Sequence, residues 1–263
     1  MRSPHLPEPA AKAAPPVPAR PLSGWSTLGW VVLSFCAWLA AQAIVLIAFL
    51  VRWSARNPGV PLDVDKVTHD SYVVSIAAIA GAVVQCAVVI LAIQRAQQPV
   101  TDYLGLVRRP HPREILFCLA SVAILLIASD LLSLSIGQDL VPPFMAEVYN
   151  AARNAGAFAI LLFVVMAVLA APISEEIVFR GFLFRGWAGS ALGVTGTIVV
   201  TSAIWAAIHV QYDWFGIVQV FCLGLLFGWV RARSGSTLLT MMMHAVCNIA
   251  ATAETAVIID WLS

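Results

Sequence analysis

Long apolar runs separated by short polar stretches make up most of the chain. A helix that spans a bilayer needs about 20 predominantly apolar residues. The runs predict membrane-spanning helices at residues 27–51, 71–93, 114–134, 157–184, 191–211, 214–230 and 237–258. The first run exceeds the core of about 7–15 residues of a cleaved signal peptide, so we expect it to remain as a span.

Composition indicates the same class of protein. Of the 263 residues, 60% are hydrophobic and only 11% are charged, whereas soluble proteins are roughly 45–50% apolar and about 25% charged. The net charge of +1 gives no indication of a nucleic-acid partner. We therefore predict an all-α, polytopic membrane bundle of about seven transmembrane helices with short interfacial helices.

The chain divides into three predicted parts. Residues 1–24 are rich in Pro and Ala and predict a disordered cytoplasmic tail. Residues 25–98 would supply two N-terminal transmembrane helices, and residues 99–263 the core that carries the intramembrane polar groups. With the N-terminus inside, eleven Lys and Arg residues lie on the inner side and four on the outer side, which favours this orientation.

Two stretches outside the spans are more than connectors. Residues 99–113 are expected to lie along the inner surface, and residues 142–156 to form an outer interfacial helix. The side chains of this helix predicted to face lipid are Phe144, Met145, Val148 and Tyr149. The pattern Gly224-x-x-x-Gly228 predicts that the sixth span approaches a neighbour closely.

Polar residues within the spans are the candidates for chemistry, because each charge at the bilayer centre costs roughly 2.5–3.5 kcal/mol on insertion scales. In the fourth span, Glu176 and Arg180 are four residues apart and can pair on one helical face. Glu175 points about 100° away and is left as a candidate general base. Pro172 favours a kink beside these residues. A purely structural Glu–Arg pair is the alternative.

Two further motifs add histidines. In the fifth span, Trp205 and His209 share a helical face, although a lone histidine in an apolar helix is often only a core residue. In the seventh span, His244 and Asn248 are one turn apart and can direct two donors at one point. Two such donors suit a developing oxyanion, and they also suit hydrogen bonding between helices.

The order Glu-Glu-x-x-x-Arg, aromatic-x-x-x-His and His-x-x-x-Asn on successive spans resembles the CPBP intramembrane proteases, the CAAX prenyl protease 2-like or Abi membrane proteins. The resemblance covers roughly residues 100–255. It departs at Trp205, where Phe is usual, and we expect little effect beyond packing. The resemblance implies an intramembrane endopeptidase of a bacterial plasma membrane that hydrolyses membrane-associated proteins or peptides.

Roles follow from the resemblance. Glu175 and His209 would activate the attacking water, and His244 and Asn248 would stabilise the oxyanion. The supporting residues would be Glu176 and Arg180. The family is commonly named a metalloprotease family, and a divalent metal such as zinc could be bound by Glu175, His209 and His244.

Other interpretations stay open at this point. Glu175 could act as the base without a metal, and the usual His-Glu-x-x-His zinc motif is not found in the sequence. A non-catalytic binding or immunity scaffold is the main alternative to an enzyme. Haem ligation by His209 and His244 is a third, which leaves the two glutamates unexplained. The substrate and its prenylation, and the oligomeric state, are not indicated.

Overall fold

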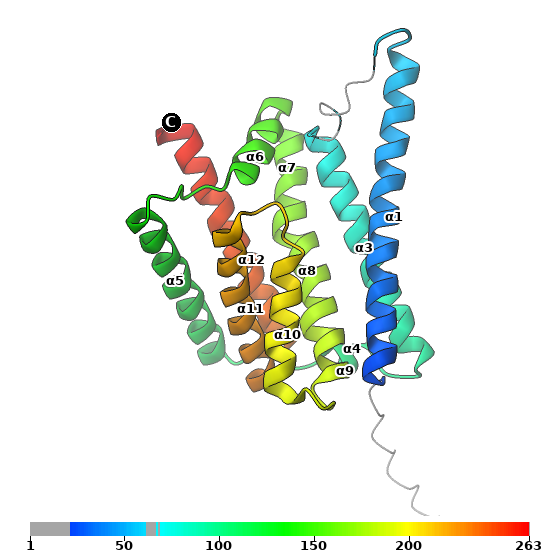
Figure 1. Cartoon of the computed structure of the whole chain (residues 1–263), viewed down its shortest axis with the longest axis vertical. Coiled ribbons are helices and arrows are strands. Elements are labelled where there is room, and N and C mark those ends of the chain that lie inside the picture. Colours follow the sequence, from blue (N-terminus) through cyan, green and yellow to red (C-terminus); the bar gives the residue numbers. More distant parts are fainter. Residues whose placement is uncertain (1–21, 62–66, 68, 263) are drawn as a thin grey trace, which may run out of the picture.

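The fold is a bundle of helices that cross back and forth along one axis (Figure 1). The computed structural model describes residues 22–61, 67 and 69–262, and the predicted tail up to residue 21 lies outside them. All regular structure in the described residues is helical, which confirms the predicted fold class. The long helices are α1 (Gly24–Arg56), α3 (Ser71–Arg95), α5 (Pro112–Ser135), α10 (Gly193–Ala207), α11 (Trp214–Ser234) and α12 (Thr237–Val257).

The fourth predicted span is one continuous helical rod, Ala157–Trp187, built from five segments. They are α7 (Ala157–Val164), the π-helix η1 (Val165–Ala170), α8 (Ala171–Glu176), the π-helix η2 (Ile177–Leu183) and α9 (Phe184–Trp187). The hydrophobic pattern predicted the rod but not its two π-helical stretches. Both stretches flank α8, so the two glutamates lie between two departures from α-helical geometry.

Seven helical passages in the described part of the chain agree with the predicted number of spans. In Figure 1 the chain enters α1 at the bottom, and α12 ends at the top. Six helices among the described residues are long and apolar enough to cross a membrane, and α10, with 15 residues, is a shorter apolar helix. Polar N-caps set several starts: Asp70 accepts from two backbone N–H groups at the start of α3, and Asp213 and Ser236 cap α11 and α12.

Glycines bring α11 close to α10, as the spacing predicted. A Cβ at Gly224 would lie 2.8 Å from Cβ of Ser202, and one at Gly228 would lie 2.9 Å from Cγ2 of Ile198. Neither position has room for a side chain without a shift of its neighbour. The carbonyl of Gly224 also accepts a hydrogen bond from Arg180 of the rod, which matters for the site described below.

The interfacial helix α6 (Pro143–Ala155) forms as predicted, but the orientation predicted for two of its residues is wrong. Val148 and Tyr149 are buried against Phe163 of α7 rather than facing lipid. The Tyr149 hydroxyl donates to Asp260 at 2.7 Å in the terminal π-helix η3 (Ile258–Leu262), and Arg153 pairs with the same carboxylate at 3.1 Å. These polar contacts hold that face of α6 against the bundle, and the apolar side chains of that face pack in a second hydrophobic cluster.

At the opposite end, residues 99–113 pack against the bundle through the short helix α4 (Val100–Leu104). Tyr103 and Leu104 are buried in the main core. The backbone carbonyl of Leu104 accepts from the Thr237 hydroxyl at 2.5 Å, which ties α4 to the start of α12. This end of the bundle is where α1 begins and where the rod meets α10 (Figure 1).

Candidate active site

The indole of Trp205 lies at the centre of the predicted site residues. Its Nε1 donates to Oε2 of Glu175 at 2.5 Å. The rings of His209 and His244 pack edge-on to it, with centroids 5.2 and 5.3 Å away. The guanidinium of Arg180 lies over its face at 4.4 Å, within the range of a cation–π contact. One buried side chain of α10 therefore contacts groups from the rod and from α12.

A buried charged cluster supports this centre. Glu176 and Arg180 are 0% and 2% exposed, and Oε1 of Glu176 accepts from Nη1 of Arg180 at 2.9 Å. The pairing predicted from their spacing is thus present. Nδ1 of His244 lies 3.1 Å from the same oxygen. Arg180 also donates to the carbonyl of Gly224 at 3.3 Å, so the close packing of α11 supplies an acceptor for the guanidinium.

His209 lies beyond the end of its helix, which corrects the predicted extent of the fifth span. The helix α10 ends at Ala207, and the backbone N–H of His209 donates to Ala206 in a tighter turn. The carbonyl of Trp205 is then without its α-helical donor, and Nδ1 of His209 lies 2.7 Å from it. Because a carbonyl only accepts, Nδ1 carries the hydrogen, and Nε2 remains available. The imidazole thus stays beside Trp205, as the spacing predicted.

Asn248 makes a bond that no motif indicated. Its Nδ2 donates to the carbonyl of Ala167 in η1 at 2.7 Å. In π-helical geometry the donor to that carbonyl would come from residue 172, which is Pro172 and has no N–H. Asn248 therefore fills the position of a missing backbone donor. The rod and α12 also line a cavity of about 330 Å³, with Val164 and Val168 from the rod and Ile249 and Thr252 from α12, among others.

The contacts join five of the six predicted residues. Glu175, Glu176, Arg180, His209 and His244 are linked directly or through Trp205. Asn248 is placed one helical turn after His244 and bonds to the rod instead. Within the described residues, no three His, Cys, Asp or Glu side chains form a group that could hold a metal ion. Binding of a divalent metal by Glu175, His209 and His244 therefore stays a prediction.

Two contributors were missed by the sequence reasoning. Trp205 was treated as equivalent to Phe, yet its Nε1 binds the predicted base, and Phe has no such donor. Phe227 of α11 packs on both Trp205 and His244, at 5.9 and 5.7 Å between ring centroids. The role of Trp205 could have been recognised from its indole N–H, a polar group one helical turn before an intramembrane histidine.

Comparison with known protein families finds a match in the segment that carries the candidate active site. Residues 157–250 match the family described as Type II CAAX prenyl endopeptidase Rce1-like, which confirms the resemblance predicted from the motifs. The matched segment contains the three motifs, from Glu175 to Asn248. No curated protein and no solved structure shows a significant match to the chain.

Proposed function

We propose, from the match of residues 157–250 to the prenyl endopeptidase family, that this membrane protein hydrolyses a peptide bond of membrane-associated protein or peptide substrates. The observation that carries the proposal is the position of Trp205. It holds a carboxylate on one side and two imidazoles at its edges, all inside the bundle. A carboxylate and an imidazole on one rigid support are suited to activate water beside a bound substrate.

In this proposal Glu175 is the general base. Trp205 occupies Oε2, which leaves Oε1 to take a proton from water. Nε2 of His209 orients that water, because its Nδ1–H is held by the carbonyl of Trp205. The water oxygen attacks the carbonyl carbon of the substrate, and the proton on Glu175 then passes to the leaving nitrogen as the C–N bond breaks.

In this proposal His244 is an oxyanion donor. Its Nδ1 lies 3.1 Å from Oε1 of Glu176, which holds the ring against the acidic motif of the rod and leaves Nε2 as the group that would face the substrate. That group would stabilise negative charge on the tetrahedral intermediate.

Asn248 would be the second donor. Its amide nitrogen carries two hydrogens, and the bond to Ala167 uses one of them. The remaining N–H is free to reach the same oxyanion. The cavity of about 330 Å³ between the rod and α12 is lined mainly by apolar side chains and offers space for an apolar side chain of the substrate.

Each step above is assigned to a side chain of this protein, and binding of a divalent metal by Glu175, His209 and His244 stays a separate prediction. The check is to measure cleavage after chelation and dialysis, with metal content determined in the same sample. We expect the rate to remain within about twofold, too small a change for the loss of a group worth several kcal/mol of transition-state stabilisation. Recovery only on adding zinc would instead assign Glu175, His209 and His244 to a metal.

The central test compares membrane peptides by mass spectrometry in cells that express the unmutated protein or Glu175→Gln. The matched control is Glu147→Gln, the same change on an exposed position of α6. We expect products that disappear with Glu175→Gln and persist with the control. Normal turnover by a folded Glu175→Gln protein would end the proposal. A peptide that is bound but never cut by the unmutated protein would instead favour the binding or immunity scaffold.

A further inference from the structure

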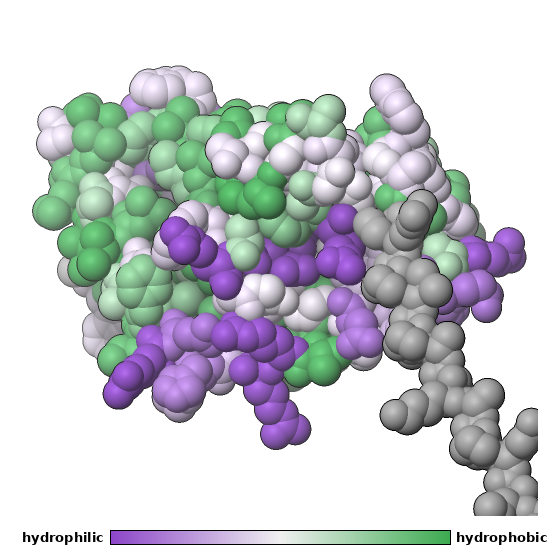
Figure 2. All heavy atoms as spheres, turned by 90° about the horizontal axis from the view of Figure 1, so that it is seen from below, coloured by the Kyte–Doolittle hydropathy of each residue, from purple (hydrophilic) through white to green (hydrophobic). Residues whose placement is uncertain are grey.

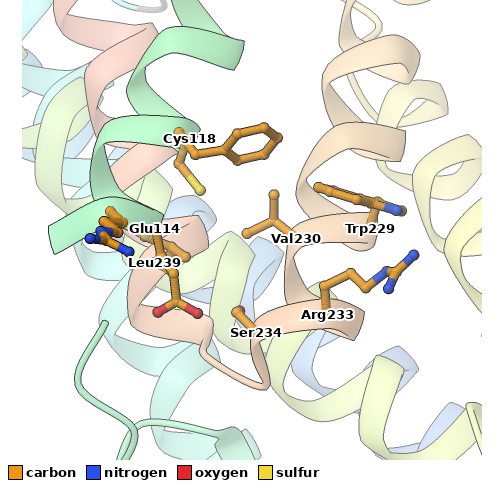
Figure 3. A pocket seen from close by; sticks show the side chains of 9 residues that line it. Glu114, Cys118, Trp229, Val230, Arg233, Ser234 and Leu239 are labelled. Carbon is orange, nitrogen blue, oxygen red and sulfur yellow. The ribbon is translucent and has the colours of Figure 1, made fainter. Parts of the chain in front are cut away.

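A second cavity lies outside the candidate active site, between the start of α5 and the end of α11 (Figure 3). Its volume is about 240 Å³. It opens at the end of the bundle where α1 begins, and Figure 2 shows hydrophilic residues gathered across that end between apolar flanks. The cavity is therefore at the depth where a span meets the lipid headgroups, if the helices cross as predicted.

The interior of this cavity is apolar. Cys118 and Val230 point into it from α5 and α11, and Leu239 of α12 also lines it. The rings of Phe117 and Trp229 meet at 6.0 Å and line the same cavity. Both rings are also exposed at the surface, at 53% and 42%. A hydrocarbon chain fits such walls, and a free inorganic anion gains nothing from them.

The rim of the cavity carries excess positive charge. Glu114 is already paired, because Arg108 binds it at 2.7 Å and also donates to the carbonyl of Ser234 at 2.5 Å. Arg113 and Arg233 line the same rim, and neither has a carboxylate partner among the residues that the structure describes. Arg233 lies 5.7 Å from the centroid of the Trp229 ring. Two unpaired guanidinium groups therefore flank an apolar cavity.

We propose that this cavity binds an anionic phospholipid from the leaflet on the side where α1 begins. The headgroup phosphate would bind Arg113 and Arg233, since guanidinium groups bind phosphate oxygens in a planar, bidentate manner. One acyl chain would lie between α5 and α11, against Phe117 and Val230. This site is independent of the proposed peptidase activity, because none of its lining residues contacts Trp205 or the two active-site histidines in the contacts described above.

The test is native mass spectrometry of the full-length protein released from detergent, titrated with phosphatidylglycerol or phosphatidylcholine. We expect tight retention of one phosphatidylglycerol and weaker retention of phosphatidylcholine. The double variant Arg113→Gln/Arg233→Gln should lose affinity for phosphatidylglycerol on the order of tenfold, since each arginine near an anionic headgroup contributes about 1 kcal/mol. The matched control is Arg52→Gln/Arg56→Gln, two exposed arginines at the far end of α1.

Four results would overturn the proposal. They are equal retention of both lipids, an unchanged affinity in the double variant, an equal loss in the control, and displacement of the lipid by inorganic phosphate or by an acidic peptide at similar concentrations. The thermal midpoint of the double variant serves as a folding check. If it falls, the single variants Arg113→Gln and Arg233→Gln are titrated instead, and each must weaken phosphatidylglycerol binding.

Discussion

Nε1 of Trp205 donates a 2.5 Å hydrogen bond to Oε2 of Glu175, and this contact connects the aromatic motif of α10 to the acidic motif of the rod. The bond fixes one oxygen of the proposed base and leaves the other free. It also gives the chain a feature that the usual Phe of the resembling family does not have. The orientation of Glu175 therefore depends on the indole N–H of Trp205. Phe could replace Trp205 in packing but could not donate this hydrogen bond.

We predict that Trp205→Phe keeps the fold but slows cleavage about tenfold, because a hydrogen bond to a charged group contributes roughly 1.5–3 kcal/mol. The measurement is the cleavage rate as a function of pH, which should change in shape as well as height when the environment of Glu175 changes. Trp214→Phe, on a tryptophan 69% exposed at the start of α11, is the control. An unchanged rate and pH profile would show that the bond does not position the base.

The Asn248 bond to Ala167 predicts coupling to Pro172. Asn248→Ala should lower the free energy of unfolding by about 1–3 kcal/mol, because the Ala167 carbonyl loses its donor. Pro172→Ala provides the missing backbone N–H, so the same Asn248→Ala change should cost less in that background. A double-mutant cycle on unfolding free energies measures the difference. Strict additivity would contradict this explanation of η1.

The cleavage rate distinguishes the structural role of Asn248, its bond to Ala167, from its proposed role as an oxyanion donor. If the amide also binds the oxyanion, cleavage by Asn248→Ala should fall about 10²–10³-fold. Adding Pro172→Ala should then restore stability without restoring the rate. Recovery of both together would mean that Asn248 only holds the rod in place.

The buried Glu176–Arg180 pair should be far more sensitive than a surface pair. Arg180→Met leaves Glu176 as an unpaired buried carboxylate and should cost about 3–5 kcal/mol. Arg153→Met breaks the pair with Asp260, where Arg153 is 52% exposed, and should cost about 0–1 kcal/mol. Thermal unfolding of both variants in one detergent checks this ranking, and equal midpoints would refute it.

Close packing of α11 on α10 gives a steric prediction. Gly224→Ala places a Cβ against Ser202 and should destabilise the protein by about 1–3 kcal/mol. It should also slow cleavage, because Gly224 presents a carbonyl to Arg180. Gly29→Ala in α1 is the control, since nothing lies within 4 Å of its added methyl group. If Gly224→Ala left both the stability and the cleavage rate unchanged, α10 and α11 could move apart without loss of stability or activity.

Hydropathy predicted the crossing helices well because lipid imposes a length and an apolar surface on each of them. The Glu176–Arg180 pair was predictable for a similar reason, since four residues of one helix place both partners on one face. The burial of Tyr149 was not predictable in this way, because its partner Asp260 is 111 residues away, in the π-helix η3.

The details of the site also depend on distant partners. The π-helical stretch η1 is stabilised by Asn248, 81 residues further along the chain. The end of α10 before His209 depends on a side chain replacing a backbone donor, which hydrophobic periodicity does not encode. Local patterns therefore indicated which intramembrane polar residues to consider, and the contacts among helices determine how each of them is oriented.

The pairing of Glu176 with Arg180 within one helix has a consequence for biosynthesis. His244, the third member of that cluster, belongs to α12, which leaves the ribosome after the rod. The fourth membrane segment must enter the lipid before this histidine exists, and an isolated charge there would resist insertion. Because Glu176 and Arg180 are neighbours on one helical face, the segment can be integrated with these two charges already offset, and assembly of the site can wait until α12 has been made.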